Sequence, residues 1–215
     1  MNKLVIFDLD DTLLCADSEF HFTKYVLKQG MLDKDFYLKK IKAFDKDYRS
    51  GNLNFRDYMR FLLYPLIGKN KNEVDLLVAN FINSSKDILI DDLTFELLKK
   101  HEKDNLLIAS GALDFIVKGF ANYFKVEEFL GTKTEFVEDK VTGETVGEPN
   151  FDKGKLVHVL KWCKQKKVNL EEATFYTDSI HDLPLVEKCK NSIVVSPDER
   201  LKEHAEKNNL QIITR

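Results

Sequence analysis

This chain of 215 residues is poor in cysteine, proline and glycine, with 3, 4 and 9 of them respectively. So little proline and glycine excludes the collagen-like and low-complexity classes. The cysteines, Cys15, Cys163 and Cys189, are odd in number and include no CxxC pair. We therefore expect neither a disulfide framework nor a thiolate zinc site, and we expect a reducing environment for the protein.

The sequence also lacks long apolar runs and a strong excess of either charge. Its first apolar run ends at Asp8, whereas a signal peptide needs an apolar core of about 7–15 residues and a membrane span needs about 20. We therefore expect no signal peptide, no membrane partner and a cytoplasmic location. The formal net charge is −3, from 33 basic and 36 acidic residues, so a nucleic-acid partner is disfavoured.

The composition itself is that of a globular protein, with 43% hydrophobic and 32% charged residues, arranged as alternating strands and helices. Short apolar runs predict buried strands at residues 3–7, 105–109, 173–177, 192–195 and 210–213. Helical patterns lie between them, one after residue 111 and the others near residues 92–102, 151–167 and 198–208. Turn residues within 129–147 indicate a β-hairpin. Strands separated by helices predict an α/β fold with a Rossmann-like parallel sheet and right-handed crossovers.

Residues from about 17 to 88 differ, because they are helical throughout. Ser18 is expected to cap the first helix and Asn54 the third, and Tyr37, Ile41 and Phe44 follow helical spacing in the second. Four amphipathic helices with short joints predict a small bundle, and we expect most of the aromatic residues of this segment to lie in its core. We therefore predict a Rossmann-like core of residues 1–16 and 89–215, interrupted after its first strand by a helical domain of residues 17–88.

Three of the predicted strands end in polar clusters. The clusters are Asp8, Asp10 and Thr12, then Ser110 and Gly111, then Asp178, Ser179 and Asp182. A single acid after a strand usually caps the next helix and complements its dipole. In a parallel sheet, however, all three clusters meet at one edge, where open α/β sheets bind their ligands. This convergence favours a functional site.

Carboxylates crowded in this way suit a magnesium-dependent transfer of a phosphoryl group. Close carboxylates repel one another unless one is protonated or they share a cation, and oxygen ligands with open positions favour Mg²⁺. Asp8 and Asp178 are the natural side-chain ligands, and the second oxygen of Asp8 can attack phosphorus. Asp10 can give a proton to the leaving oxygen and later take one from water. The phosphoryl oxygens need a hydroxyl, an amide and a lysine, roles that suit Ser110, Gly111 and a lysine still to be placed.

The motifs resemble those of the haloacid dehalogenase-like superfamily. Residues 7–13 (FDLDDTL) look like its first motif, DxDx[TV], residues 108–111 (IASG) like its second and residues 177–182 (TDSIHD) like its fourth. Their order along the chain matches, and the helical insertion lies where a type 1 cap belongs. In residues 176–185 the chain most resembles subfamily IB, the phosphoserine phosphatase-like hydrolases.

The resemblance implies catalytic and metal-binding roles. Asp8 would form an aspartyl-phosphate, with Asp10 as the acid and base. Asp8, the main-chain carbonyl of Asp10 and Asp178 would bind Mg²⁺. Ser179 and Asp182 would lie behind these groups, where Asp182 supports the metal ligands or the phosphate-binding lysine.

The resemblance also implies a set of phosphate-binding residues. These are Thr12, Ser110, Gly111 and a lysine. For the lysine we favour Lys155 over Lys153, because Gly154 and Lys155, followed by an amphipathic helix, resemble the Gly-Lys helix start of the subfamily.

We therefore predict a Mg²⁺-dependent, phosphoserine phosphatase-like hydrolase of a small phosphorylated metabolite. Phosphoserine phosphatases carry Glu nine residues after the nucleophile, where this chain has Asp17, with Glu19 nearby. Phosphoserine, histidinol phosphate, phosphoethanolamine and phosphocholine all stay candidate substrates. The alternatives are a phosphotransferase that uses the same intermediate and a phospho-aspartate switch or binding protein. A carbon–halogen hydrolase is disfavoured, since it needs neither Asp10 nor Asp178.

Overall fold

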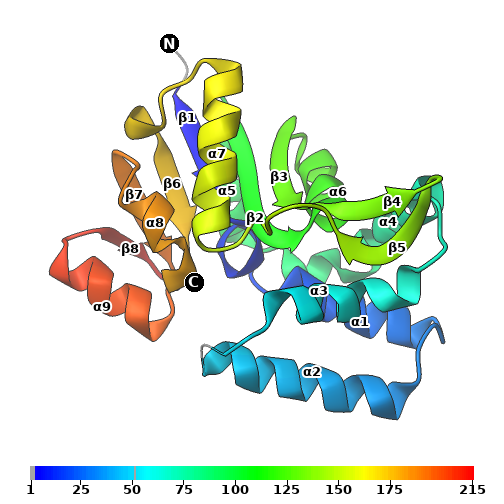
Figure 1. The fold of residues 1–215 in the computed structure, drawn as a ribbon. Helices are drawn as coiled ribbons and strands as arrows, with labels where there is room; N and C mark the ends of the chain where they lie inside the picture. The colour runs from blue at the N-terminus through cyan, green and yellow to red at the C-terminus, as the bar shows by residue number, and fades with distance from the viewer. Residues whose placement is uncertain (1–2, 51) are drawn as a thin grey trace.

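The structure, a computed structural model, describes residues 3–50 and 52–215, and six parallel strands form the main sheet of these residues (Figure 1). Their order across the sheet is β3-β2-β1-β6-β7-β8. Their bounds are Leu4–Phe7 (β1), Asn105–Leu113 (β2), Glu128–Thr132 (β3), Thr174–Thr177 (β6), Asn191–Val195 (β7) and Gln211–Ile213 (β8). The prediction of an α/β fold with a parallel sheet is confirmed.

The central strand β1 lies where the direction of strand addition reverses. Its neighbours β2 and β6 pair with it in parallel on opposite sides. Loops at the carboxyl ends of such neighbouring strands diverge, and the crevice between them is where open α/β sheets bind ligands. The order of the strands therefore places the candidate site at the end of β1.

Helices cover both faces of the sheet, which explains why the strand sequences are continuous apolar runs. Val5 and Phe7 face one cluster of core residues, together with side chains of α4, α5 and α6, while Leu4 and Ile6 face another with α7 and α8. The helix bounds are Lys71–Leu89 (α4), Asp92–Lys100 (α5), Asp114–Phe124 (α6), Lys153–Lys166 (α7), Leu183–Val186 (α8) and Glu199–Lys207 (α9). All four residues of β1 are buried.

Two predictions of the strands need correction. The expected hairpin at 129–147 is smaller, because residues 128–132 form β3, an edge strand parallel to β2, and only β4 (Thr134–Val137) and β5 (Lys140–Thr145) pair as a hairpin. Gly131 permits this, since a Cβ there would lie 2.7 Å from the Cα of Asp114. Strand β2 continues to Leu113, so Ser110 and Gly111 lie within it rather than after it.

The helical segment from residue 17 to residue 88, called the cap below, lies beneath the carboxyl end of the sheet, with α2 outermost (Figure 1). Its other helices are α1 (Ser18–Lys28), α3 (Phe55–Leu63) and most of α4, and α2 spans Lys34–Arg49. Asn54 caps α3 as predicted, accepting from Asp57 N at 3.2 Å. Ser18, in contrast, is the first residue of α1, and the cap residue is Asp17, which accepts from Phe20 N at 2.8 Å.

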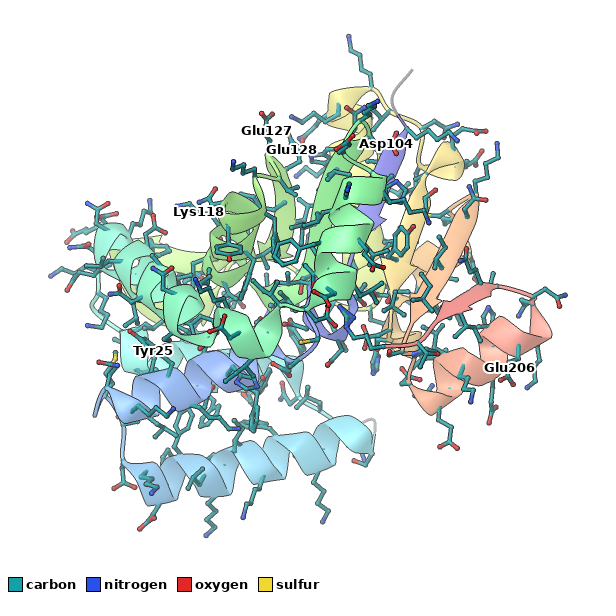
Figure 2. All side chains as sticks on the ribbon, turned by 180° about the vertical axis from the view of Figure 1, so that it is seen from behind. Tyr25, Asp104, Lys118, Glu127, Glu128 and Glu206 are labelled. Atoms are coloured by element: carbon teal, nitrogen blue, oxygen red, sulfur yellow. The ribbon has the colours of Figure 1, made fainter. Side chains whose placement is uncertain are left out.

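The opposite end of the sheet carries acids of its own. Figure 2 shows Asp104, Glu127 and Glu128 at the end of the sheet away from α2. Asp104 pairs with His101 at 3.0 Å and Glu128 with Lys166 and Trp162, so Asp104 and Glu128 have local partners. Within the described part of the chain, no helix is long and apolar enough to cross a membrane.

Candidate active site

The loop after β1 presents the first polar cluster. The Asp8 amide donates to the Tyr176 carbonyl of β6 at 2.9 Å, and a wide turn, η1 (Leu9–Leu13), follows, closed by Leu14 N–H to Leu9 O at 2.8 Å. Within it Asp11 has a φ of +53°, a conformation that Asp tolerates better than most residues. The turn sets the side chains of Asp8 and Asp10 toward one cavity.

The second cluster is held by buried side chains that the sequence analysis did not identify. The Asn150 side-chain amide donates to Ser110 O at 2.8 Å and to Leu130 O at 3.2 Å. The Thr132 hydroxyl donates to Gly111 O at 2.7 Å. These bonds fix the carboxyl end of β2 against β3. No motif flags Asn150 or Thr132, because their partners are about twenty to forty residues away in the sequence.

Lys155 joins two of the clusters. Its ammonium Nζ lies 3.1 Å from Asp8 Oδ2 and 2.6 Å from Asp182 Oδ1, and the Thr177 hydroxyl donates to Asp182 Oδ2 at 2.7 Å. Lys155 is 3% exposed, whereas Lys153 is exposed. Of the two lysines considered, the structure brings Lys155 to Asp8.

Asp178 and Thr12 meet from the third cluster and the first. The Thr12 hydroxyl donates to Asp178 Oδ1 at 2.9 Å, and Thr12 is completely buried. This placement differs from the expected phosphate contact, because the hydroxyl is used to orient a carboxylate. Ser179 accepts from His181 N at 3.3 Å and so caps the short turn η4 (Ile180–Asp182).

Asp10 ties the loop to the cap. Its carboxylate accepts from Ser18 N, the first residue of α1, at 2.6 Å. Burial raises the pKa of Asp10 well above its usual range, and Asp17 and Asp8 raise it further against the bonds from Ser18. This carboxyl group of the loop after β1 is held against α1 beside the cavity, where it can carry a proton.

Burial and neighbouring charges also raise the pKa values of Asp8 and Asp178. Burial raises the pKa of Asp8 to about 7, Lys155 opposes the shift, and Asp182 adds to it. Burial likewise raises the pKa of Asp178, with Asp8 the next contributor. For Lys155, burial disfavours the charge, but Asp182 and Asp8 outweigh burial and raise its pKa. The cluster therefore holds more negative charge than Lys155 neutralises.

Oxygen donors with excess negative charge fit a hard divalent cation. Among the described residues, no group of three or more His, Cys, Asp and Glu side chains is arranged to hold a metal ion. The expected ligands are instead two carboxylates, Asp8 and Asp178, and the Asp10 carbonyl. Mg²⁺ commonly uses one or two carboxylates and fills its other positions with water and phosphate oxygens, so this set suits it.

The clusters open on one cavity of about 760 Å³ between the sheet and the cap. Asp8, Ser110, Lys155 and Asp178 contribute from the core, and side chains of α1, α2 and α3 contribute from the cap. The volume is in the usual range for a small-molecule site.

The sequence of this chain matches a known protein family. The model of the haloacid dehalogenase-like hydrolase family matches residues 5–187. The chain belongs to this family. A relative named histidinol-phosphatase, from Neisseria meningitidis serogroup C, is 28% identical over 219 residues and covers 99% of each chain. Phosphatase-named relatives of this kind identify the family member as a phosphatase enzyme.

Two solved structures show the same fold as this member of the family. A protein of unknown function from Bordetella pertussis Tohama I superposes with a TM-score of 0.90 at 24% identity, over 99% of both chains. A substrate-bound phosphoserine phosphatase complex superposes with a TM-score of 0.71 at 20% identity, over 99% of this chain and 93% of the other. The resemblance to this family, expected from three motifs, is confirmed.

Proposed function

We propose that the chain is a Mg²⁺-dependent phosphatase that hydrolyses the phosphomonoester of a small metabolite through a phosphorylated Asp8. The observation that carries the proposal is the buried bridge from Lys155 to Asp8 and Asp182, at distances of 3.1 and 2.6 Å. It joins β1, α7 and the loop after β6 at the edge of the sheet where ligands bind. A buried lysine held between two acids is charged and preorganised for a phosphoryl group.

The first step forms the acyl phosphate. One carboxylate oxygen of Asp8 attacks phosphorus, the bond from phosphorus to the leaving oxygen breaks, and the carboxyl proton of Asp10 passes to that oxygen. The Ser110 hydroxyl, the Gly111 amide and the Lys155 ammonium bind the phosphoryl oxygens. Thr12 orients Asp178. Mg²⁺, when bound by Asp8, the Asp10 carbonyl and Asp178, supplies positive charge beside the phosphoryl group.

The second step returns the enzyme to its starting state. Asp10, now ionised, takes a proton from a water molecule whose oxygen attacks phosphorus. The bond from phosphorus to the Asp8 oxygen breaks, which releases inorganic phosphate and restores the Asp8 carboxylate. The same carboxyl group thus gives and regains one proton in each turnover.

The cavity favours hydrolysis of a small molecule over a phospho-aspartate switch. A phospho-aspartate switch has to present its acceptor to a partner protein, whereas Asp8 is 8% exposed at the floor of the cavity beneath the cap. A phosphotransferase needs room for an acceptor alcohol, and the same assay separates it by the appearance of a new ester. The relatives named histidinol-phosphatase and phosphoserine phosphatase make the two corresponding esters the first to test.

The test is release of inorganic phosphate from a panel of metabolite esters, with Mg²⁺ and with a chelator. Asp8→Asn is expected to lose at least about a thousandfold in kcat, since loss of a nucleophile removes the covalent route. Asp92→Asn, an exposed acid at the start of α5, is the matched control and should keep full activity. Turnover that survives Asp8→Asn, or that ignores the chelator, would contradict the proposal. A lasting acyl phosphate without turnover would favour the switch.

A further inference from the structure

The roof of the cavity is apolar although its floor is charged. The roof side chains come from α1, α2, the start of α3 and the loop before it, and they are Phe20, Leu38, Ile41, Phe44, Leu53 and Phe55. Phe20 and Leu38 are 37% and 38% exposed, so large apolar groups face the cavity without full cover. A phosphate group and a hydrated cation occupy only a small part of about 760 Å³, which leaves this apolar part for the leaving group.

Rings make up one wall of this apolar part. Phe55 from the cap stacks on Phe151 from the loop before α7, with ring centroids 4.6 Å apart and an angle of 13° between planes. The His181 ring lies 4.7 Å from the Phe151 ring on the core side. The ring centroids of Phe44, on α2, and Tyr58 lie 5.4 Å apart. Flat rings bind well against such side chains, because stacked and edge-to-face contacts add to the burial of apolar area.

The charged side chains around the roof disfavour an anionic leaving group, because two acids at the start of α1, Asp17 and Glu19, also line the cavity. Of the described basic residues that line the cavity, Lys155 is engaged by Asp8 and Asp182, and Lys24 lies 3.9 Å from the centre of the Phe20 ring. Lys42 is exposed on α2. No arginine is among the described lining residues, so the pocket lacks the forked donor that binds a carboxylate in two places.

We infer that the leaving group is an alcohol that carries a flat, apolar ring and no carboxylate, bound between the aromatic side chains of the cap and Phe151. The inference rests on the proposed function and narrows its substrate class. It also distinguishes this chain from an enzyme built for phosphoserine, whose leaving group is small and carries a carboxylate.

Two matched pairs of esters test the inference by their kcat/KM. Ethyl phosphate and 2-phenylethyl phosphate differ in the ring alone, and phosphoethanolamine and phosphoserine differ in the carboxylate alone. The ring should raise kcat/KM at least about tenfold, the scale of discrimination in an apolar pocket, and the carboxylate should lower it. Equal values within the first pair, or a clear gain from the carboxylate, would overturn the inference.

Substitutions in α2 test whether the preference for esters that carry a ring depends on the side chains of the roof. Phe44→Ala should reduce the advantage of the ring while ethyl phosphate is still hydrolysed, and Phe44→Leu serves if the alanine variant folds poorly. Phe36→Ala is the control, because Phe36 is 53% exposed on the same helix and does not line the cavity. A ring preference that survives both changes at Phe44 would contradict the inference. If no ester is turned over in an Asp8-dependent way, the proposed function fails as well, and the two failures are thereby distinguished.

Discussion

The side chain of Lys155 sits between two acids with almost no contact to water. Asp182→Asn removes one of these acids and leaves Asp8 as the acid partner of Lys155. The variant is therefore expected to lower the free energy of unfolding in urea titrations by about 1.5–3 kcal/mol, the scale of a hydrogen bond to a charged group. Glu144→Gln is the control, since Glu144 pairs with Arg60 at 2.8 Å with both side chains nearly half exposed, and an exposed pair contributes at most about 1 kcal/mol. Equal effects of the two variants would show that Lys155 is not held by Asp182.

Glu19 gives a prediction about pH. Its carboxylate is 7% exposed and accepts from Leu113 N at 2.9 Å, and burial, then Asp17 and Asp10, raise its pKa well above 4.5. An acid whose pKa is raised by folding binds its proton more tightly in the folded state, so its contribution to stability is present below about pH 4.5 and is lost as pH rises. Glu19→Gln removes the cost of ionisation and should raise Tm at pH 8 but not at pH 4.

The comparison for Glu19 is an exposed acid. Glu96→Gln on α5 changes a glutamate at the surface and should move Tm little at either pH. For a chain of this length, a gain of 1 kcal/mol corresponds to about 2–4 °C, which thermal melts resolve. A lower Tm for Glu19→Gln at pH 8 would mean that the ionised carboxylate is stabilised in the folded protein, against the expected sign.

Residues of the candidate site were predictable from the sequence where a motif follows a strand. Asp8 and Asp178 are such residues, because the apolar run before each one predicts that it lies at the edge of the sheet, whereas Ser110 lies within β2. The direction of a side chain was harder to predict, as the Thr12 hydroxyl shows by its bond to Asp178. Asn150 carries no local signal, since its role depends on Ser110 and Leu130 far away in the chain. Which of these residues act in catalysis stays a prediction.

At the scale of elements, helix α7 depends on a close approach at its start. A Cβ on Gly154 would lie 2.1 Å from the Pro149 carbonyl oxygen, and a backbone atom cannot turn away as a flexible side chain can. Gly154→Ala should therefore displace the first turn of α7, lower the free energy of unfolding by about 1–3 kcal/mol and reduce turnover, because Lys155 is the next residue. Val157→Ala, at a 58% exposed position of the same helix, should cost less than about 0.5 kcal/mol.

Whole elements were predicted well where one periodicity dominated. The strand at residues 3–7 and the helices near 92–102 and 151–167 appear as β1, α5 and α7. Strand β3 was misassigned to a hairpin, because all of its residues before Thr132 are only half-buried and an edge strand of that kind has the same pattern in either pairing. Tertiary contacts around Gly131 decide between pairing with β2 and pairing in a hairpin, and such contacts cannot be predicted from the local sequence pattern.

At the scale of the molecule, the candidate site is assembled from segments far apart in the sequence. Arg215, the last residue of the sequence given, also contacts these segments. Its guanidinium donates to Thr12 O at 2.9 Å, to Leu13 O at 3.1 Å and to Asp91 at 2.9 Å. Such links join the loop after β1 to the start of α5, where the chain returns from the cap. The meeting of strand ends follows from parallel topology, but the clamp by Arg215 and the shape of the cavity depend on packing between distant segments. The boundaries of the cap at residues 17 and 88 stay a prediction.

Because the proposed magnesium ligands belong to the loops after β1 and β6, the metal should stabilise the whole fold. A ligand that binds only the folded state adds RT ln(1 + [L]/Kd) to the free energy of unfolding, about 2.7 kcal/mol at a concentration of 100 Kd. We expect MgCl₂ to raise Tm of the wild type by several degrees and to raise that of Asp178→Asn much less. KCl at matched ionic strength measures the general salt effect, and Asp75→Asn, at an exposed pair with Lys118, should respond to MgCl₂ as the wild type does. The shift is measured within each variant, because removing a carboxylate from this crowded cluster changes stability by itself. An equal rise of Tm in the wild type and in Asp178→Asn would place the cation elsewhere.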